Sequence, residues 1–230
     1  MIADWRAALI LIVCGACVAL TACTAEPPAV IPVPALDNPK VAGAPQTIVL
    51  AGGCFWGVQA VFQHLNGVQQ AVSGYAGGDR ATAQYETVSS GQTGHAESVQ
   101  ITFDPAIVSY GEILRVFFSV AHDPTQLNRQ GPDSGTQYRS AIFYADERQQ
   151  QIATAYIAQL ARSGQFRMPI VTRVDPLQGF YPAEDYHQDF LLKHPSDPYI
   201  VFNDAPKVRY FQRLLPELYR VTPATTTLTR

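Results

Sequence analysis

Cys54 is the residue of this sequence whose surroundings most clearly favour chemistry. It lies in the stretch LAGGCFWGVQAVF, residues 50–62, after two glycines and before Phe55 and Trp56. The apolar run at 47–51 predicts a strand that ends just before the glycines, and a helical pattern begins just after them. Unpaired backbone N–H groups and the positive end of the helix dipole favour a thiolate there. This position predicts a reachable nucleophile, whereas the more common role of a free cysteine is that of a small core residue.

The elements that must position Cys54 alternate between strand and helix patterns. Helices are predicted where apolar residues recur at helical spacing, over residues 54–65, 110–121, 147–162, 184–193 and 207–218. Further strands are predicted over residues 69–75, 96–103, 139–145 and 169–174. This order predicts one α+β domain, a sheet-and-helix sandwich akin to the ferredoxin-like split βαβ arrangement. The order of the strands within the sheet does not follow from the pattern.

Composition limits the partners and cofactors of this domain. The chain has 230 residues and a net charge of −3, without a basic run, which argues against nucleic acid or an anionic membrane surface as partner. His95-Ala96-Glu97 resembles half of a zinc deaminase signature, but the required downstream Pro-Cys-x-x-Cys is missing. No other histidine spacing suggests three zinc ligands, so we predict no metal site.

The N-terminus has the pattern of a targeting segment rather than of a folded element. Residues 7–20 are apolar throughout and precede Leu20-Thr21-Ala22-Cys23, which resembles the lipobox of bacterial lipoproteins. We expect a signal peptide at 1–22 and a lipid on Cys23, which would anchor an exported protein to a membrane. If two membranes are present, Thr24 favours the outer one. The alternatives are an ordinary secretory signal or an uncleaved anchor.

Composition also predicts the limits of the folded part. Six prolines within residues 23–45 predict an extended tether. The folded domain is expected over residues 46–220, and the Thr-rich end, residues 221–230, is expected to be a flexible tail.

Six segments give the chain a resemblance to a known family, the A-type peptide methionine sulfoxide reductases. The segments are GCFWG (53–57), SGYAGG (73–78), TGHAESVQI (93–101), HDPTQ (122–126), GTQYRSAIFY (135–144) and AEDYHQDF (183–190). They follow the family's order across nearly the whole folded part, roughly residues 46–213. The resemblance implies reduction of methionine-S-sulfoxide, in proteins and free, to methionine. It implies no organic cofactor or metal.

The resemblance assigns a role to each residue around the cysteine. Cys54 matches the nucleophile that attacks the sulfoxide sulfur and becomes a sulfenic acid as methionine leaves. Phe55 and Trp56 match the aromatic pocket for the S-methyl group, which packs well on aromatic faces. The alternative role for both aromatic residues is core packing.

The resemblance also implies a set of groups around the sulfoxide oxygen. Glu97 matches the carboxyl group that donates a proton to this oxygen, and Tyr85 and Tyr138 match two phenols that hydrogen-bond to it. Asp133 matches a carboxylate that orders the site. The alternative, non-catalytic roles are a solvent-facing strand residue for Glu97, a surface tyrosine for Tyr85 and a turn residue for Asp133.

A proton donor at Glu97 requires a protonated carboxyl group near neutral pH, so its pocket must raise its pKa. Strand alternation places Glu97 on the same face as Val99 and Ile101, which favours an inward position. His187, in the segment AEDYHQDF, is expected to pack or hydrogen-bond near the site rather than to bind a metal.

The chain departs from many family members in one respect, since no cysteine follows Cys54. Its C-terminal part resembles the single-cysteine subgroup. We therefore expect an external thiol, from a thioredoxin-like partner, a glutaredoxin system or a small molecule, to reduce the sulfenic acid. Two other functions remain open at this point: another single-cysteine thiol enzyme, such as a peroxidase or glutathione transferase, and a lipoprotein binding module without catalysis.

Overall fold

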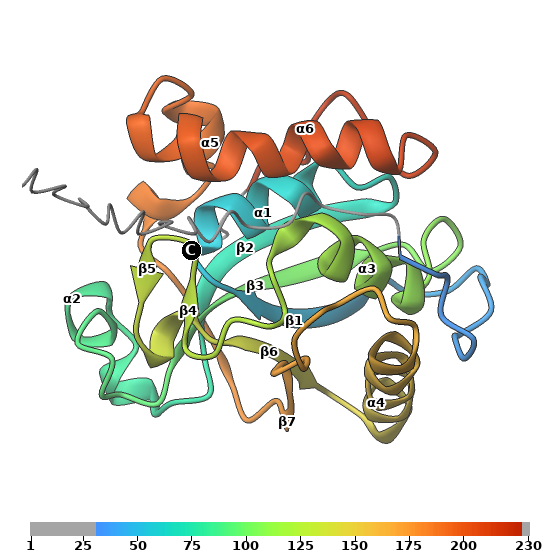
Figure 1. The fold of residues 1–230 in the computed structure, drawn as a ribbon. Coiled ribbons are helices and arrows are strands. Elements are labelled where there is room, and N and C mark those ends of the chain that lie inside the picture. Colours follow the sequence, from blue (N-terminus) through green and yellow to red (C-terminus); the bar gives the residue numbers. More distant parts are fainter. Residues whose placement is uncertain (1–30, 227–230) are drawn as a thin grey trace, which may run out of the picture.

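A six-stranded sheet runs through the computed structural model, which describes residues 31–226 (Figure 1). The strand order is β7-β6-β1-β3-β2-β8, and every neighbouring pair is antiparallel except β6 and β7. The strands are β1 (Gln46–Gly52), β2 (Val68–Ala76), β3 (Ala96–Phe103), β6 (Ser140–Tyr144), β7 (Arg173–Pro176) and β8 (Phe180–Pro182).

The four central strands form two interleaved split βαβ units, which confirms the predicted fold class. Helix α1 (Phe55–Gln63) connects β1 to β2, and β3 lies between these two strands. Helix α3 (Tyr110–Val116), extended by a π-helical turn at Phe117–Ala121, connects β3 to β6 around β1. Helix α4 (Glu147–Arg162) then leads to β7, which adds to the edge of the sheet in parallel with β6.

Strand alternation divides the interior into a large and a small cluster. In β1, Ile48 and Leu50 face the large core between the sheet and the helices, whereas Val49 and Ala51 face a small cluster on the opposite side. Alanine and one phenylalanine, Phe143, dominate that second cluster. The main core therefore lies on the helical side, and the site is built where this core meets the ends of β1 and β3.

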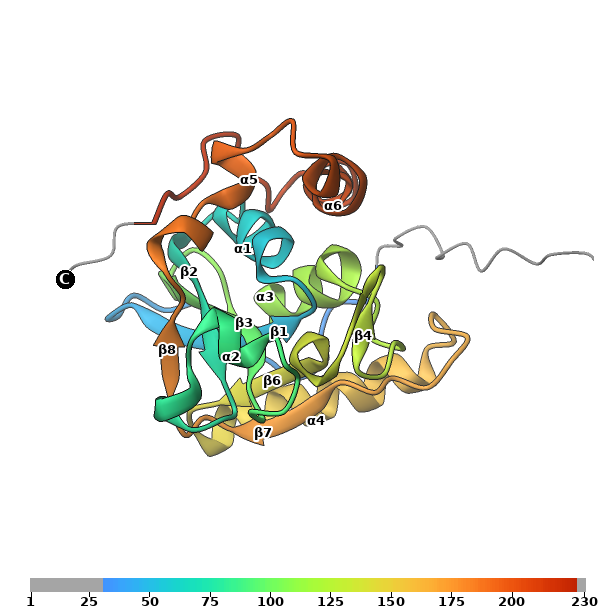
Figure 2. The ribbon, with the colours of Figure 1, turned by 90° about the vertical axis from the view of Figure 1, so that its left-hand side faces the viewer.

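The C-terminal part adds a further layer over α1. Helices α5 (Phe190–Lys193) and α6 (Ala205–Leu214) and a π-helical turn at Ile200–Asp204 pack on α1, and Figures 1 and 2 show α6 and α5 beyond it. The short elements are α2 (Tyr85–Val88), the ribbon β4 (Arg129–Gln130) and β5 (Asp133–Ser134), and 3-10 turns at Arg80–Thr82, Thr136–Tyr138 and Asp185–His187.

The structure differs from the predicted elements mainly after α4. The strand predicted at 169–174 is displaced to β7, because pairing with β6 begins only at Arg173. Strand β8 was not predicted, since it has three residues and ends in a proline at the sheet edge. The helix predicted at 184–193 is broken at Asp189, whose φ of 56° is left-handed.

Part of the Pro-rich segment lies against the domain. Ile31 is buried in the main core, and its carbonyl accepts a hydrogen bond from Arg115 Nε at 3.2 Å. The next carbonyl, of Pro32, accepts from Tyr156 Oη at 2.7 Å. Asp37 accepts from the backbone N–H of Gly111 at 2.7 Å, at the start of α3. Residues 31–37 are therefore docked on the domain and do not extend away from it as a tether.

The end of the chain is also held in place as far as it is described. The Ala224 N–H donates to the Gln63 carbonyl at 2.9 Å, and the Thr226 N–H donates to Asp189 Oδ1 at 3.0 Å. Residues 224 and 226, within the segment expected to be a flexible tail, are therefore hydrogen-bonded to the domain. The predicted signal peptide, Cys23 and the last four residues lie outside the described part. Within residues 31–226, no helix combines the length and the apolar character that a membrane span requires.

Candidate active site

Cys54 lies at the turn between β1 and α1. Gly53 precedes it with φ of +87°, and a Cβ at Gly53 would lie 2.4 Å from the Gln130 side chain, so only glycine fits this turn. Cys54 is the N-cap residue of α1, and its side chain makes no capping hydrogen bond. Only 8% of its surface is exposed. The structure therefore shows a buried cysteine where the sequence predicted a reachable one.

The environment of Cys54 corrects the expectation of a resting thiolate. Burial raises the pKa of the thiol well above its usual value, and the carboxyl groups of Glu97 and Asp204 raise it further. The Trp56 N–H and the Lys207 ammonium oppose this rise but do not reverse it. The helix terminus therefore counts for less than desolvation, and the resting group is a thiol.

Glu97 meets the requirement for a proton donor. It is 4% exposed, at the start of β3, and its Oε2 accepts a hydrogen bond from the Phe55 backbone N–H at 3.0 Å. Burial raises the pKa of its carboxyl group to about 8, and the charges of Asp133 and Asp204 act in the same direction. Glu97 is therefore largely protonated at neutral pH, as the inward-facing strand position predicts.

Two phenols flank the same space. Tyr85 opens α2, where its backbone N–H donates to Glu184 Oε1 at 2.9 Å, and Tyr138 closes a 3-10 turn. Both rings are half-buried, and burial together with the nearby charge of Glu97 raises both phenol pKa values. Each phenol therefore stays a neutral hydrogen-bond donor.

Trp56 forms an aromatic wall beside the cysteine. Its ring stacks on Phe190 with centroids 3.7 Å apart and meets the edge of Tyr199 at 5.8 Å. Its indole N–H donates to His187 Nδ1 at 3.1 Å, which places His187 near the site as expected. Phe55 is 1% exposed and belongs to the core, so Trp56 is the more accessible of the two predicted pocket residues.

Similarity to known proteins decides the family. A family model described as "Peptide methionine sulfoxide reductase" matches residues 46–217. The chain belongs to the peptide methionine sulfoxide reductase family. Its activity is therefore the reduction of methionine sulfoxide, with electrons supplied by thiols rather than by a prosthetic group.

Individual relatives agree with this family. "Peptide methionine sulfoxide reductase MsrA 2" of Mesorhizobium japonicum is 59% identical over 184 residues, which cover 80% of this chain and 94% of the relative. The protein of the same name from Synechocystis is 54% identical over 187 residues, which cover 80% of this chain and 87% of the relative.

Solved structures of the family resemble this chain as well. The reduced form of Mxr1 from Saccharomyces cerevisiae has a TM-score of 0.61 at 34% identity, covering 66% of this chain and 87% of its own. Methionine sulfoxide reductase A of Corynebacterium diphtheriae has a TM-score of 0.57 at 36% identity. The match covers 75% of this chain and 87% of the Corynebacterium chain.

The candidate site contains three residues that the sequence did not single out. Tyr199 donates its phenol O–H to Asp133, and Asp204 and Lys207 form an ion pair beside α1. All three come from the segment PYIVFNDAPK, 198–207. Pro206 is typical of a helix start, and the resemblance of this C-terminal part to the single-cysteine subgroup assigned no role to the three residues.

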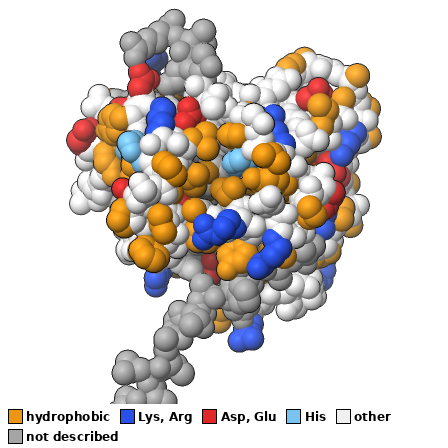
Figure 3. All heavy atoms as spheres, turned by 90° about the horizontal axis from the view of Figure 1, so that it is seen from above, with side chains coloured by type: hydrophobic (Ala, Val, Ile, Leu, Met, Phe, Trp, Pro, Cys, Tyr) orange, Lys and Arg blue, Asp and Glu red, His pale blue; other side chains and the backbone are white. Residues whose placement is uncertain are grey.

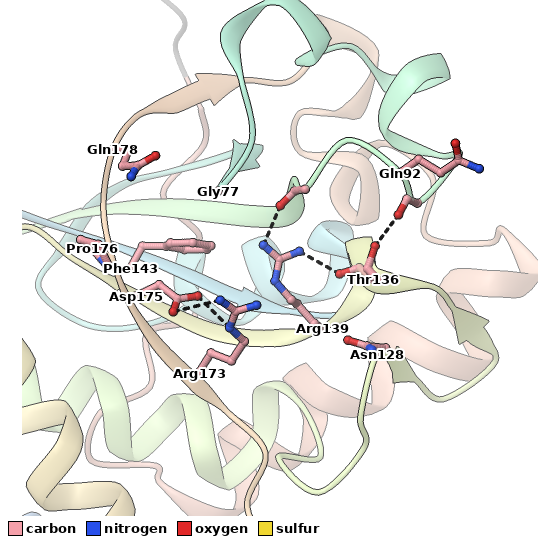
Figure 4. Close-up of a pocket in the computed structure, with 12 residues that line it drawn as sticks. Gly77, Gln92, Asn128, Thr136, Arg139, Phe143, Arg173, Asp175, Pro176 and Gln178 are labelled. Atoms are coloured by element: carbon pink, nitrogen blue, oxygen red, sulfur yellow. Dashed lines mark hydrogen bonds and ion pairs between the residues drawn. The ribbon is translucent and has the colours of Figure 1, made fainter.

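A hollow of about 580 Å³ lies outside the reductase site, at the edge formed by β6 and β7 (Figure 4). Arg139 lines it and donates to the carbonyls of Gly94, His95 and Thr136 at 2.8–2.9 Å. These bonds fasten the loop before β3 to the turn that carries Tyr138. We therefore assign Arg139 a structural role.

The histidine pattern that suggested half a zinc signature has a structural explanation. His95 Nε2 hydrogen-bonds to the Asp79 carbonyl at 2.9 Å, which closes the loop between β2 and β3. Among residues 31–226, no three His, Cys, Asp or Glu side chains are grouped so that they could hold a metal ion.

Proposed function

We propose that the chain reduces methionine-S-sulfoxide, in proteins and free, through a sulfenic acid on Cys54, with Glu97 as proton donor and an external thiol as reductant. The observation that carries this proposal is a buried, largely protonated carboxyl group beside a buried thiol at the start of α1. A sulfoxide oxygen leaves sulfur only when it is protonated, so the reaction needs such an acid next to the nucleophile.

Substrate binding uses the aromatic and phenolic side chains. The partly exposed face of Trp56 is available to the S-methyl group, since polarizable sulfur and its methyl pack well on aromatic rings. Tyr85 and Tyr138 donate hydrogen bonds to the sulfoxide oxygen without adding charge. Asp133, fixed by the Tyr199 phenol, orders the same side of the pocket.

Oxygen transfer then proceeds without net uptake of protons. The Cys54 sulfur attacks the sulfoxide sulfur while Glu97 protonates its oxygen, and the proton of the thiol passes to the Glu97 carboxylate. The hydroxyl group then moves from the substrate sulfur to the Cys54 sulfur as the bond between the two sulfurs breaks. Methionine leaves, reduced by two electrons, and Cys54, oxidised by two electrons, holds the oxygen as a sulfenic acid. A neutral substrate thus meets a site whose acid and thiol are both neutral at the start.

Regeneration depends on thiols from outside the chain. No cysteine follows Cys54, and the earlier cysteines lie in the predicted signal peptide and at the predicted lipid site. One external thiol attacks the Cys54 sulfur and releases water, and a second thiol displaces Cys54 to form a disulfide. A thioredoxin-like protein or a glutaredoxin system supplies both electrons, as does a pair of small thiols.

Export forms the final part of the proposal. The lipobox-like end of the apolar segment supports cleavage before Cys23 and attachment of a lipid to it, which places the enzyme on the outer side of the cytoplasmic membrane. If the organism has two membranes, Thr24 favours the outer one. Mass spectrometry of protein extracted from membranes would test this, since an unmodified Met1 or a lipid-free Cys23 would contradict the anchor.

The decisive experiment offers the two epimers of dabsyl-methionine sulfoxide separately, with dithiothreitol present. We expect wild type to consume only the S-epimer and the Cys54→Ser variant to consume neither. Rapid consumption of peroxide without any methionine product would instead favour a thiol peroxidase. Parallel assays with thioredoxin, glutaredoxin and glutathione rank the reductants, and a disulfide within the chain after one turnover would contradict the external-thiol step.

A further inference from the structure

A buried ion pair lies against the first turn of α1, close to Cys54. Asp204 is fully buried at the end of the π-helical turn, and Lys207 Nζ donates to its Oδ1 at 3.0 Å. The Lys207 side chain is 18% exposed. Buried ion pairs add little net stability, because desolvation of both charges offsets their attraction. This pair therefore needs an explanation other than stability.

Gly57 shows how closely the pair approaches the helix. It is the third residue of α1, one turn from Cys54. A Cβ at this position would lie 2.1 Å from Asp204 Oδ1 and 2.9 Å from Lys207 Nζ. The missing side chain at residue 57 is what lets the pair reach the helix turn that carries the cysteine.

The side chains around Cys54 are mostly acids, of which Glu97 and the phenols are neutral at pH 7. The nearby carboxyl groups are Glu97, Asp133 and Asp204, and the nearby phenols are Tyr85, Tyr138 and Tyr199. Among the described residues that act on the cysteine, Lys207 is the cation. Among the described residues, none hydrogen-bonds to the second carboxylate oxygen of Asp204, and Lys207 is the cation paired with this buried charge.

We propose that the Asp204–Lys207 pair sets the charge at the Cys54 sulfur, with Lys207 stabilising the negative charge that the sulfur carries once the thiol has lost its proton. Asp204 holds the ammonium against α1 and keeps the pair neutral overall. Both are positioning residues, because they act on the sulfur through space and not on the substrate. This inference rests on the proposed role of Cys54 as nucleophile.

Two single substitutions with opposite expected signs test the proposal. Lys207→Gln removes the cation and should raise the pH at which Cys54 becomes reactive, whereas Asp204→Asn removes an anion and should lower it. The readout is the rate of alkylation of Cys54 by iodoacetamide against pH, measured by mass spectrometry of the Cys54 peptide in the full chain. At any pH below the inflection, the rate changes about tenfold for each pH unit by which the inflection moves.

Matched controls separate charge from structure. Lys40→Gln also removes a lysine from a carboxylate pair, with Glu112 at 2.8 Å, and should leave the alkylation profile unchanged. Lys207→Arg should stay close to wild type, and the double variant Asp204→Asn/Lys207→Gln should fall between the two single variants. If Lys207→Gln does not fold, Lys207→Met keeps the apolar stem and replaces it.

The proposal is overturned if both single variants fold and shift the profile in the same direction, or if neither shifts it. Because alkylation requires no turnover, this result is independent of whether Cys54 is the catalytic nucleophile. Retention of activity by Cys54→Ser would sink the proposed function and leave the alkylation shifts standing.

Discussion

Glu97 on the β3 side of Cys54 and Asp204 on the α6 side are both buried carboxyl groups, but their partners differ. Glu97 accepts one backbone N–H, no cation of residues 31–226 forms an ion pair with it, and burial raises its pKa to about 8. Asp204 is paired with Lys207, whose pKa the pair raises further. Burial raises the pKa of both carboxyl groups, but Lys207 opposes this rise at Asp204, and no described cation does so at Glu97.

The difference shows how one small site can hold an acid and a nucleophile together. A protonated Glu97 adds no negative charge next to the sulfur, and Lys207 offsets the charge that Asp204 adds. Figure 3 shows hydrophobic side chains on the face that carries α5 and α6. Val201 and Phe202, in the π-helical turn before α6, are exposed. The layer that brings Asp204 and Lys207 to the cysteine therefore also forms part of the surface around the site.

The largest effect is expected at Cys54, the residue on which both carboxyl groups act. Cys54→Ser should abolish reduction of the S-epimer, because a serine hydroxyl ionises far less readily than a thiol and cannot take up the oxygen as a sulfenic acid. We expect a loss of at least about a thousandfold in kcat, measured with dabsyl-methionine-S-sulfoxide. The thermal transition serves as control, and activity with an unchanged transition would remove Cys54 from the mechanism.

Glu97→Gln removes the carboxyl group on the β3 side and leaves the Asp204–Lys207 pair unchanged. The amide still accepts the Phe55 N–H but has no proton to donate, so oxygen transfer in a single turnover should slow by roughly 10²–10³. Asp204→Asn is the matched change on the other side and should not produce a comparable loss of proton transfer. Equal losses in the two variants would mean that the carboxyl groups do not differ in role.

The pH dependence of stability sharpens the same comparison. The folded pKa of Glu97, about 8, lies above its unfolded value near 4.5, so its favourable contribution is complete below pH 4.5 and is lost as the pH rises through 8. The Glu97→Gln variant lacks this loss. Its free energy of unfolding relative to that of wild type should therefore increase by about 3 kcal/mol from pH 5 to pH 7.5. Urea unfolding at both pH values measures the gain. A difference that does not vary with pH would refute the raised pKa.

The two phenols should contribute less than the acid. Tyr138→Phe and Tyr85→Phe each remove one neutral donor to the sulfoxide oxygen, and each should lower kcat/KM by about tenfold. The ring packing is retained in both variants, so the binding of the reduced product, methionine, provides the control. A loss confined to methionine binding would assign these tyrosines to packing.

Asp37→Ala should have the smallest effect and should leave both carboxyl groups untouched. Asp37 caps the start of α3 through the Gly111 N–H, far along the chain from the site residues. Its removal should lower the free energy of unfolding by about 1 kcal/mol with kcat unchanged. A fall in kcat at full folding would show that the docked segment reaches the site.

The parts of the site that regular elements position could be predicted from the sequence. Cys54 follows from a strand, a glycine turn and a helix start, and the inward position of Glu97 follows from alternation with Val99 and Ile101. The resting thiolate expected from the helix terminus was wrong, because burial of the sulfur outweighs the helix dipole.

The C-terminal layer could not be predicted in the same way. Lys207 and Asp204 reach Cys54 only because α6 packs across α1, and no periodicity within 198–207 encodes that contact. Likewise, the docking of Ile31 and Pro32 depends on side chains that α3 and α4 bring together. Long-range packing decides these positions, and local patterns carry no information about it.

One measurement tests the central claim most directly: a single turnover of the full chain with methionine-S-sulfoxide, without reductant and with dimedone added as the reaction ends. The account predicts one equivalent of methionine and one dimedone adduct, located on Cys54 and absent in Cys54→Ser. Methionine formed with an unmodified Cys54, or with Cys54 locked in a disulfide to another cysteine of the chain, would contradict it.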